Sequence, residues 1–265
     1  MEQLHHELWI VGAVNALLAP VLRPIYAALG VEWPANAQPI PDYLVMSFLV
    51  VLGLTLLSAF VRARLSVEQP GKLQILLEDV VNFLNSTLRE NIGDKGPKYL
   101  PLVGAIGLFI FVANMIGKVP GLMSPTANIN VTVGCAVTVW VYYHLEGLRT
   151  QGVFRYAKHF FVMPGVPIVM APLIGVIELI SHASRVMSLS LRLFGNVFGE
   201  EMIVLIIAGL VPFIVPLPFM LLGVVTGTLQ AYIFALLTMI YLAGAVHTDH
   251  DHEVHHDEAQ AHAAA

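Results

Sequence analysis

A guanidinium and two carboxylates stand together in one of the most apolar stretches of this sequence. In SLSLRLFGNVFGEE, residues 188–201, Arg192 is followed by Asn196, Glu200 and Glu201, with apolar residues on both sides. Arginine stays protonated in proteins, so Arg192 is a fixed positive charge that cannot itself relay a proton. A carboxyl group at low dielectric can exchange its proton near neutral pH, and ionisable groups inside a membrane are costly enough to mark functional sites. The segment therefore predicts proton transfer past a fixed positive charge.

Helical spacing divides these residues between two faces of one helix. At 100° per residue, Ser188 and Asn196 lie one turn on either side of Arg192. The full stripe is Glu178, Arg185, Ser188, Arg192, Asn196 and Gly199, with Gly195 beside it. Glu201 falls on the opposite side, so we expect it to face a cavity or another helix.

A second polar stripe runs along the last apolar segment, VTGTLQAYIFALLTMIYL, where Thr226, Gln230 and Tyr241 lie on similar sides. A water-lined passage and a hydrogen-bonded helix core both explain such a stripe, and the sequence leaves the two open. His182, in ELISHASR, adds a group that titrates near neutral pH. A proton carrier and a hydrated histidine at the membrane boundary are the two interpretations of it.

The charges around Arg192 also have a purely structural explanation. Arg192 paired internally with Glu178, Glu200 or Glu201 would hold helices together without conducting anything. Several carboxylates near one arginine, however, leave protons to be distributed among them, which favours the proton-transfer interpretation.

Composition places these residues in a membrane. Of 265 residues, 57% are hydrophobic and 12% are charged, and the mean hydropathy is +0.76, outside the range of soluble globular domains. The net charge of −5 gives no indication of nucleic acid binding. Lipid requires every backbone polar group to be satisfied within the chain, so we predict an all-α, polytopic membrane protein.

Hydropathy predicts five crossings and one surface helix. The crossings are 43–61, 101–116, 129–145, 164–209 and 211–246. The last two runs are much longer than the hydrocarbon layer is thick, so we predict long, strongly inclined helices, with a bend at Pro172. Residues 71–90 keep their apolar side chains on one broad face, which is typical of a helix lying on the membrane surface.

The distribution of Lys and Arg predicts the orientation. The connections 62–98 and 146–165 hold nine of these residues, whereas the opposite side holds Arg23 and Lys118 alone. Short loops rich in Lys and Arg stay in the cytoplasm, so the N-terminus is predicted outside and the C-terminus inside.

Three segments follow from this organisation. Residues 1–40 are predicted to be an outside or interfacial segment, 41–246 the membrane domain, and 247–265 a disordered cytoplasmic tail. The tail, HTDHDHEVHHDEAQAHAAA, is rich in histidine, but its spacing matches no defined metal site. We therefore predict no metal and no cofactor.

Three motifs resemble subunit a of the F-type ATP synthase membrane sector. They are SLSLRLFGN with Glu201 nine positions after its arginine, LQAYIFALLTMIYLAGA, and SPTANINVT. The resemblance runs from about residue 40 to residue 246. It implies a stator in a cell membrane, the bacterial inner membrane, with no catalytic activity alone. It also implies three contacts: a ring of c subunits against the two inclined helices, peripheral stalk subunits of the b type, and the bilayer.

The resemblance also implies a role for each polar residue. Arg192 matches the essential arginine that faces a ring carboxylate and prevents protons from passing directly between two offset half-channels. The half-channel open to the outside is assigned Asn196, Glu200, Glu201, Gln230 and Tyr241. The cytoplasmic half-channel is assigned Glu178, His182 and Ser188, and Gly195 and Gly199 let the helix approach the ring.

This sequence departs from the family pattern at one pair of positions. Many bacterial members have a small residue where Glu200 stands and a histidine where Gly223 stands. Either Glu200 or Glu201 then serves as the main relay, with Glu200 taking part of the histidine's role. The carried ion, H⁺ or Na⁺, also stays open. The alternatives in other classes are a self-contained ion-coupled transporter and a structural scaffold, and no convincing internal repeat supports the transporter.

Overall fold

The computed structural model describes residues 9–28, 40–66, 69–119, 122–153, 156, 170–211 and 214–246. Within these ranges the regular structure is helical and includes no strand, which confirms the predicted all-α class. The predicted tail 247–265, most of the connection 146–165 and part of segment 1–40 lie outside the described residues.

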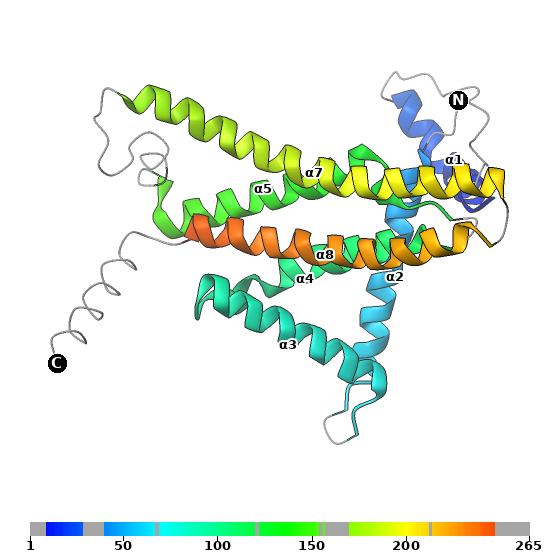
Figure 1. Cartoon of the computed structure of the whole chain (residues 1–265), viewed down its shortest axis with the longest axis horizontal. Coiled ribbons are helices and arrows are strands. Elements are labelled where there is room, and N and C mark those ends of the chain that lie inside the picture. The colour runs from blue at the N-terminus through cyan, green and yellow to red at the C-terminus, as the bar shows by residue number, and fades with distance from the viewer. Residues whose placement is uncertain are drawn as a thin grey trace. The chain divides into compact units, whose positions relative to one another are not determined.

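The described helices follow the order of the predicted apolar segments (Figure 1). They are α1 (Trp9–Ala28), α2 (Asp42–Ala63), α3 (Lys72–Ile92), α4 (Leu100–Ile116), α5 (Ile129–Gln151), α7 (Ala171–Leu210) and α8 (Pro216–Val246). Two 3₁₀ turns, η2 (Gly96–Tyr99) and η3 (Pro125–Ala127), precede α4 and α5.

Four described helical segments are long and apolar enough to cross a membrane: α2, η2 with α4, α7 and α8. The amphipathic α3 is not among them, as the surface-helix prediction requires. Nor is α5, because polar residues such as Thr138, His144 and Glu146 lower its hydropathy. The polytopic architecture is therefore confirmed, and the crossing by α5 stays a prediction.

The last two helices have the predicted exceptional length. α7 has 40 residues and α8 has 31, which at 1.5 Å per residue corresponds to about 60 Å and about 47 Å. The hydrocarbon layer is about 30 Å thick, so neither helix can stand upright within it. The predicted bend at Pro172 is wrong, because α7 begins at Ala171. A proline in the first turn removes no hydrogen bond that the helix needs.

The chain forms two compact units, and long helices contribute to both. The first unit comprises Met1–Gln74, Gly107–Thr132 and Leu191–Ala231, and the second comprises Ile75–Ile106, Val133–Ser190 and Tyr232–Ala265. The division in α7 falls immediately before Leu191. Arg192 therefore belongs to the first unit and Ser188 to the second, although one helix carries both.

In the first unit, α2 is the helix against which the neighbouring segments pack. Its residues Val45, Met46 and Val50 are buried, and both α1 and the 3₁₀ turn η3 contact it. The Asn15 side chain of α1 pairs with the backbone of Ile40, donating to its carbonyl at 3.2 Å and accepting from its N–H at 3.1 Å. These contacts hold the chain before α2 and before α5 in defined positions.

In the second unit, a close approach fixes the turn between α3 and α4. Gly93 has φ of 83°, a left-handed conformation that favours glycine and ends α3. Gly96, the first residue of η2, is buried so closely against the Leu88 backbone that an added Cβ would collide with its carbonyl. A glycine is thus required for η2 to return along the end of α3.

We predict that Gly96→Ala lowers the thermal stability of the assembled subunit. The Cβ can be accommodated only by moving backbone, and such overpacking destabilises a protein by about 1–3 kcal/mol. The control is Gly134→Ala in α5, where an added Cβ meets nothing within 4 Å. The apparent Tm of the detergent-solubilised complex measures both. Equal Tm values for the two variants would contradict the close packing at Gly96.

Candidate functional site

Arg192 lies on the exposed face of α7. Ser188, Gly195 and Asn196 are exposed on the same face, as the helical spacing predicts. On the packed side of the helix, Leu189, Leu193 and Val197 have exposed fractions of 3%, 0% and 3%. Arg192 therefore lies on the side of α7 that the described residues leave exposed.

The two glycines of the stripe are not needed for packing within this chain. An added Cβ at Gly195 or Gly199 would meet nothing within 4 Å. Large apolar side chains along the same helix, among them Leu191 and Ile206, are also exposed, by 50% and 61%. An uncovered apolar face of this extent requires lipid or a partner protein against it.

A polar cluster of the first unit joins α7 to α8 and to the chain between α4 and α5; we call it the Glu200 cluster. Asn196 donates from Nδ2 to the Gln230 Oε1 at 2.9 Å, and Gln230 is only 3% exposed. Glu200 pairs with the Lys118 ammonium group, and the Thr226 hydroxyl donates to Glu200 Oε2 at 3.4 Å.

Glu201 points to a different segment from Glu200. Its Oε1 accepts a hydrogen bond of 3.2 Å from the backbone N–H of Ser124, immediately before η3. Glu201 therefore faces another part of the chain and not the exposed face that carries Arg192, which confirms the expectation from helical spacing. The two adjacent carboxylates are held by different partners and have different surroundings.

Glu200 fills the space beside Gly223. A Cβ added at Gly223 would collide with the Glu200 carboxylate. A side chain at position 223 would therefore require the Glu200 carboxylate to move from this position. The two positions at which the sequence departs from the family pattern, 200 and 223, are thus neighbours in the structure.

A buried chain of hydrogen bonds supports the Glu200 cluster. The Ser124 hydroxyl donates to the Ala113 carbonyl at 2.8 Å and lies 2.7 Å from the Thr126 hydroxyl. Thr126 donates to Asn114 Oδ1 at 2.6 Å, and Asn114 donates from Nδ2 to the Gly227 carbonyl at 3.0 Å. The polar side chains involved are at most 1% exposed, so the network fixes η3 against α4 and α8.

The second unit holds a separate group of ionisable and aromatic side chains, which we call the Tyr143 cluster. The Tyr143 hydroxyl lies 2.7 Å from His182 Nδ1, and His182 Nε2 lies 3.2 Å from Glu178 Oε1. A neutral imidazole satisfies both contacts when Tyr143 donates to Nδ1 and Nε2–H donates to Glu178. Tyr241 packs on Tyr143 with ring centroids 6.1 Å apart, and the Arg185 guanidinium lies over Tyr241 at 5.2 Å.

The predicted site residues thus fall into three groups. Asn196, Glu200 and Gln230 meet in the Glu200 cluster, with Glu201 on the adjoining segment. Glu178, His182 and Tyr241 meet in the Tyr143 cluster. Ser188, Arg192 and Gly195 are exposed on α7, and Gly199 is half-buried. Tyr241, which the sequence grouped with the outside path, therefore has its contacts in the Tyr143 cluster.

Several polar partners were not recognised from the sequence: Asn114, Lys118, Ser124, Thr126 and Tyr143. Two of them could have been recognised from the sequence. Asn114 interrupts a continuous apolar run, and Lys118 is an exception to the distribution of basic residues. Among the described residues, no three His, Cys, Asp or Glu side chains converge in a way that could hold a metal ion.

Comparison with known proteins identifies the family. The sequence profile of the ATP synthase A chain matches residues 43–243, so the chain belongs to this family. An ATP synthase subunit a from Citrifermentans bemidjiense is 45% identical over 209 residues, 79% of this chain and 89% of the relative. Subunit a 3 from Pelobacter propionicus is 43% identical over 76% of this chain and 86% of the relative. The Koribacter versatilis subunit a is 39% identical over 93% and 99%.

Family membership establishes the general role. The chain is a multi-pass subunit of the ATP synthase membrane sector, takes part in proton translocation, and has no catalytic activity alone. This role favours the stator interpretation over a self-contained transporter or a structural scaffold.

We predict that Lys118 and Glu200 stabilise the assembled subunit as a pair. Lys118→Met leaves a largely buried carboxylate without its cation and lowers the apparent Tm of the solubilised complex. Adding Glu200→Gln removes that unpaired charge and recovers at least half of the lost Tm, as expected for coupling of about 0.5–3 kcal/mol. Strictly additive Tm changes would show that the pair contributes nothing.

Proposed function

We propose that this chain is the stator through which protons reach and leave a rotating ring of c subunits, by two half-channels that Arg192 keeps apart. The observation that supports it most directly is the order of groups along α7. Arg192 is exposed between Glu178 and His182 on one side and Glu200 and Glu201 on the other. At 1.5 Å per residue, Glu178 lies about 21 Å before Arg192 and Glu200 about 12 Å after it along the helix.

The Glu200 cluster is proposed as the half-channel open to the outside. Glu200 and Glu201 bind and release the proton, and the Asn196 to Gln230 hydrogen bond provides an amide on α7 next to the exposed face. The two carboxylates have separate partners, Lys118 and Ser124, so each can serve as a separate step of the path. Glu200 takes the place that a histidine at position 223 would occupy.

The Tyr143 cluster is proposed as the start of the cytoplasmic half-channel. His182 can pass a proton between its two ring nitrogens, since one contacts the Tyr143 hydroxyl and the other the Glu178 carboxylate. Ser188, one turn before Arg192 on the exposed face, continues the path toward the ring. Because Tyr241 contacts Tyr143 and Arg185, we assign it to this path.

Arg192 separates the two paths, so that only the ring connects them. A ring carboxylate that arrives opposite the guanidinium is stabilised in its ionised form, so it releases its proton to one half-channel before it can take another. The guanidinium cannot carry a proton itself, which blocks direct leakage. A potential of 100 mV supplies about 2.3 kcal/mol per charge moved, and rotation sums several such steps for ATP synthesis.

The exposed face of α7 is proposed as the ring-facing surface. Gly195 and Gly199 allow close approach there, which explains why residues without a packing role in this chain are small. Peripheral stalk subunits of the b type prevent the chain from turning with the ring. The basic connections 62–98 and 146–165 face the cytoplasm, so the N-terminus is outside and the C-terminus inside.

The decisive test of this function is Arg192→Ala. We expect ATP-driven proton pumping in membrane vesicles to be lost, because ring carboxylates are no longer deprotonated at the stator, while the complex still assembles. The control is Arg64→Gln, an exposed arginine after α2. Quenching of a pH-sensitive dye measures pumping, and immunodetection of the subunit measures assembly. Normal pumping by Arg192→Ala would contradict the proposal.

A paired substitution tests the role of Glu200. Gly223→His alone should reduce pumping several-fold, because its side chain collides with the Glu200 carboxylate. Combining it with Glu200→Gly frees the space and supplies a titratable imidazole in its place, so pumping should recover substantially. Glu200→Gly alone is the matched control and should be more impaired than the double variant. Pumping by the double variant that is no higher than pumping by either single variant would contradict a role of Glu200 in proton transfer.

A further inference from the structure

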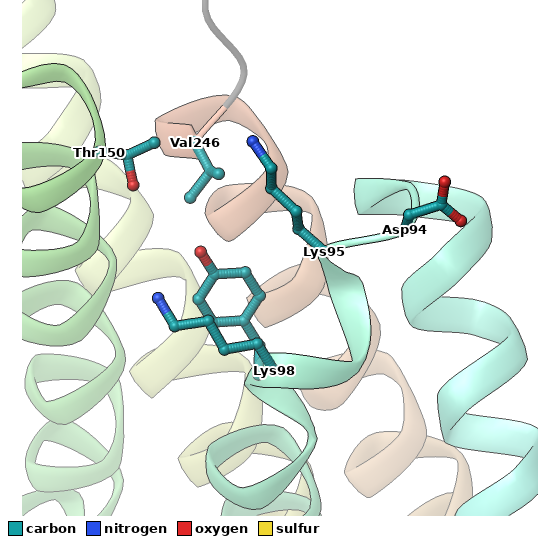
Figure 2. A pocket seen from close by; sticks show the side chains of 6 residues that line it. Asp94, Lys95, Lys98, Thr150 and Val246 are labelled. Atoms are coloured by element: carbon teal, nitrogen blue, oxygen red, sulfur yellow. The ribbon is translucent and has the colours of Figure 1, made fainter.

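A cavity of about 280 Å³ lies in the second unit, and none of the residues assigned to the half-channels lines it. Its lining residues are Asp94, Lys95, Lys98, Tyr99, Thr150 and Val246. Figure 2 shows the Lys95 and Lys98 side chains on the side of Thr150 and Val246, and the Asp94 carboxylate pointing away from them. Asp94 is fully exposed and lies 3.9 Å from the Arg89 guanidinium.

The cavity lies where three helices begin or end, and two of them, α4 and α8, belong to the segments that are apolar enough to cross a membrane. Lys98 and Tyr99 immediately precede α4, Thr150 is the penultimate residue of α5, and Val246 is the last residue of α8. Gln151 at the end of α5 donates to the Ala245 carbonyl at 3.0 Å, which holds the two helix ends together. The ends of apolar spans lie at the level of the lipid headgroups, so this cavity opens into that layer.

Positive charge exceeds negative charge around the cavity. Glu146, 2% exposed, lies between two cations, at 2.9 Å from Lys98 Nζ and 3.0 Å from Arg149 Nη1. The Lys98 and Arg149 side chains are nonetheless 64% and 73% exposed. One carboxylate neutralises one of these cations, and Lys95 adds a further exposed ammonium group. An anion can therefore bind without displacing Glu146 from its partners.

The hydroxyl groups favour a particular kind of anion. The Thr150 hydroxyl donates to the Glu146 carbonyl at 2.7 Å, so its remaining capacity toward a ligand is as an acceptor. A ligand that combines a phosphate with a hydroxyl group would satisfy both the lysines and Thr150. The volume is just below the range of about 300–1,000 Å³ that is usual for drug-sized ligands, which suits a headgroup whose acyl chains stay in the bilayer.

We propose that this cavity binds the headgroup of an anionic, glycerol-bearing phospholipid. Lys95 and Lys98 contact the phosphodiester, and a headgroup hydroxyl donates to Thr150. The bound lipid fills the space among the ends of α4, α5 and α8 and ties them to the membrane surface. The proposal depends on the chain being a membrane protein and not on the half-channel mechanism.

The test uses the assembled complex in phosphatidylcholine vesicles that contain a photoreactive phosphatidylglycerol. We expect crosslinks on the peptide containing Lys95 and Lys98. Unlabelled phosphatidylglycerol should suppress them at a lower concentration than added phosphatidylcholine or inorganic phosphate, because free phosphate has no acyl anchor. Equal competition by phosphatidylcholine, or by inorganic phosphate, would overturn the assignment to an anionic lipid.

Three variants locate the site. Lys95→Gln should weaken binding about fivefold, as expected for one lysine at an anionic membrane surface, and Lys95→Arg should restore most of it. Thr150→Val should weaken the binding of phosphatidylglycerol more than the binding of phosphatidic acid, because phosphatidic acid has no headgroup hydroxyl. The control, Lys72→Gln, removes an exposed lysine at the start of α3 and should change nothing. Unchanged crosslinking in Lys95→Gln would overturn the proposal, and normal proton pumping in that variant separates this result from a failure of the half-channel mechanism.

Discussion

The rest of the structure depends on one constraint, a permanent positive charge on the exposed side of a long apolar helix. An arginine in this position is costly by several kcal/mol or more. The nearby carboxylates make contacts of their own: Glu178 contacts His182, Glu200 contacts Lys118, and Glu201 contacts the Ser124 N–H. The proposed function uses this cation on the surface that we assign to the ring.

Polar groups around Glu201 and before α2 are satisfied by hydrogen bonds to other parts of the chain. Asn114, Ser124 and Thr126 form a buried network that satisfies backbone carbonyls of α4 and α8, and Asn15 does the same for the backbone before α2. Irregular backbone at membrane depth is tolerated only when protein covers it, and the contact of η3 with α2 provides that cover. The position of Glu201 is thus set by a turn that is itself held by residues of other helices.

Properties of a single helix could be predicted from the sequence, and contacts between helices could not. The stripe around Arg192 and the opposite direction of Glu201 follow from 3.6 residues per turn. The same periodicity predicts which way Glu200 and Tyr241 point around their helices but not which neighbour they meet. Lys118 is 82 residues from Glu200 and Tyr143 is 39 from His182, so neither pairing is visible in local pattern. Pro172 was placed at a bend because a long apolar run gives no indication of where its helix begins.

The packed side of α7 is apolar both before and after Leu191, where the two units divide. Between His182 and Glu200 that side carries Leu189, Leu193 and Val197, all buried. The polar exception, Ser190, is bonded at 2.8 Å to the Val186 carbonyl of its own helix. On α8, the Thr238 hydroxyl is likewise bonded to its own helix, at the Phe234 carbonyl. A close-packed apolar stretch holds no chain of waters, and Arg192 lies on the opposite, exposed face of the helix. The proposed separation of the two half-channels therefore depends on two properties of this helix: the apolar packed side excludes water, and the fixed positive charge on the exposed side opposes the passage of protons.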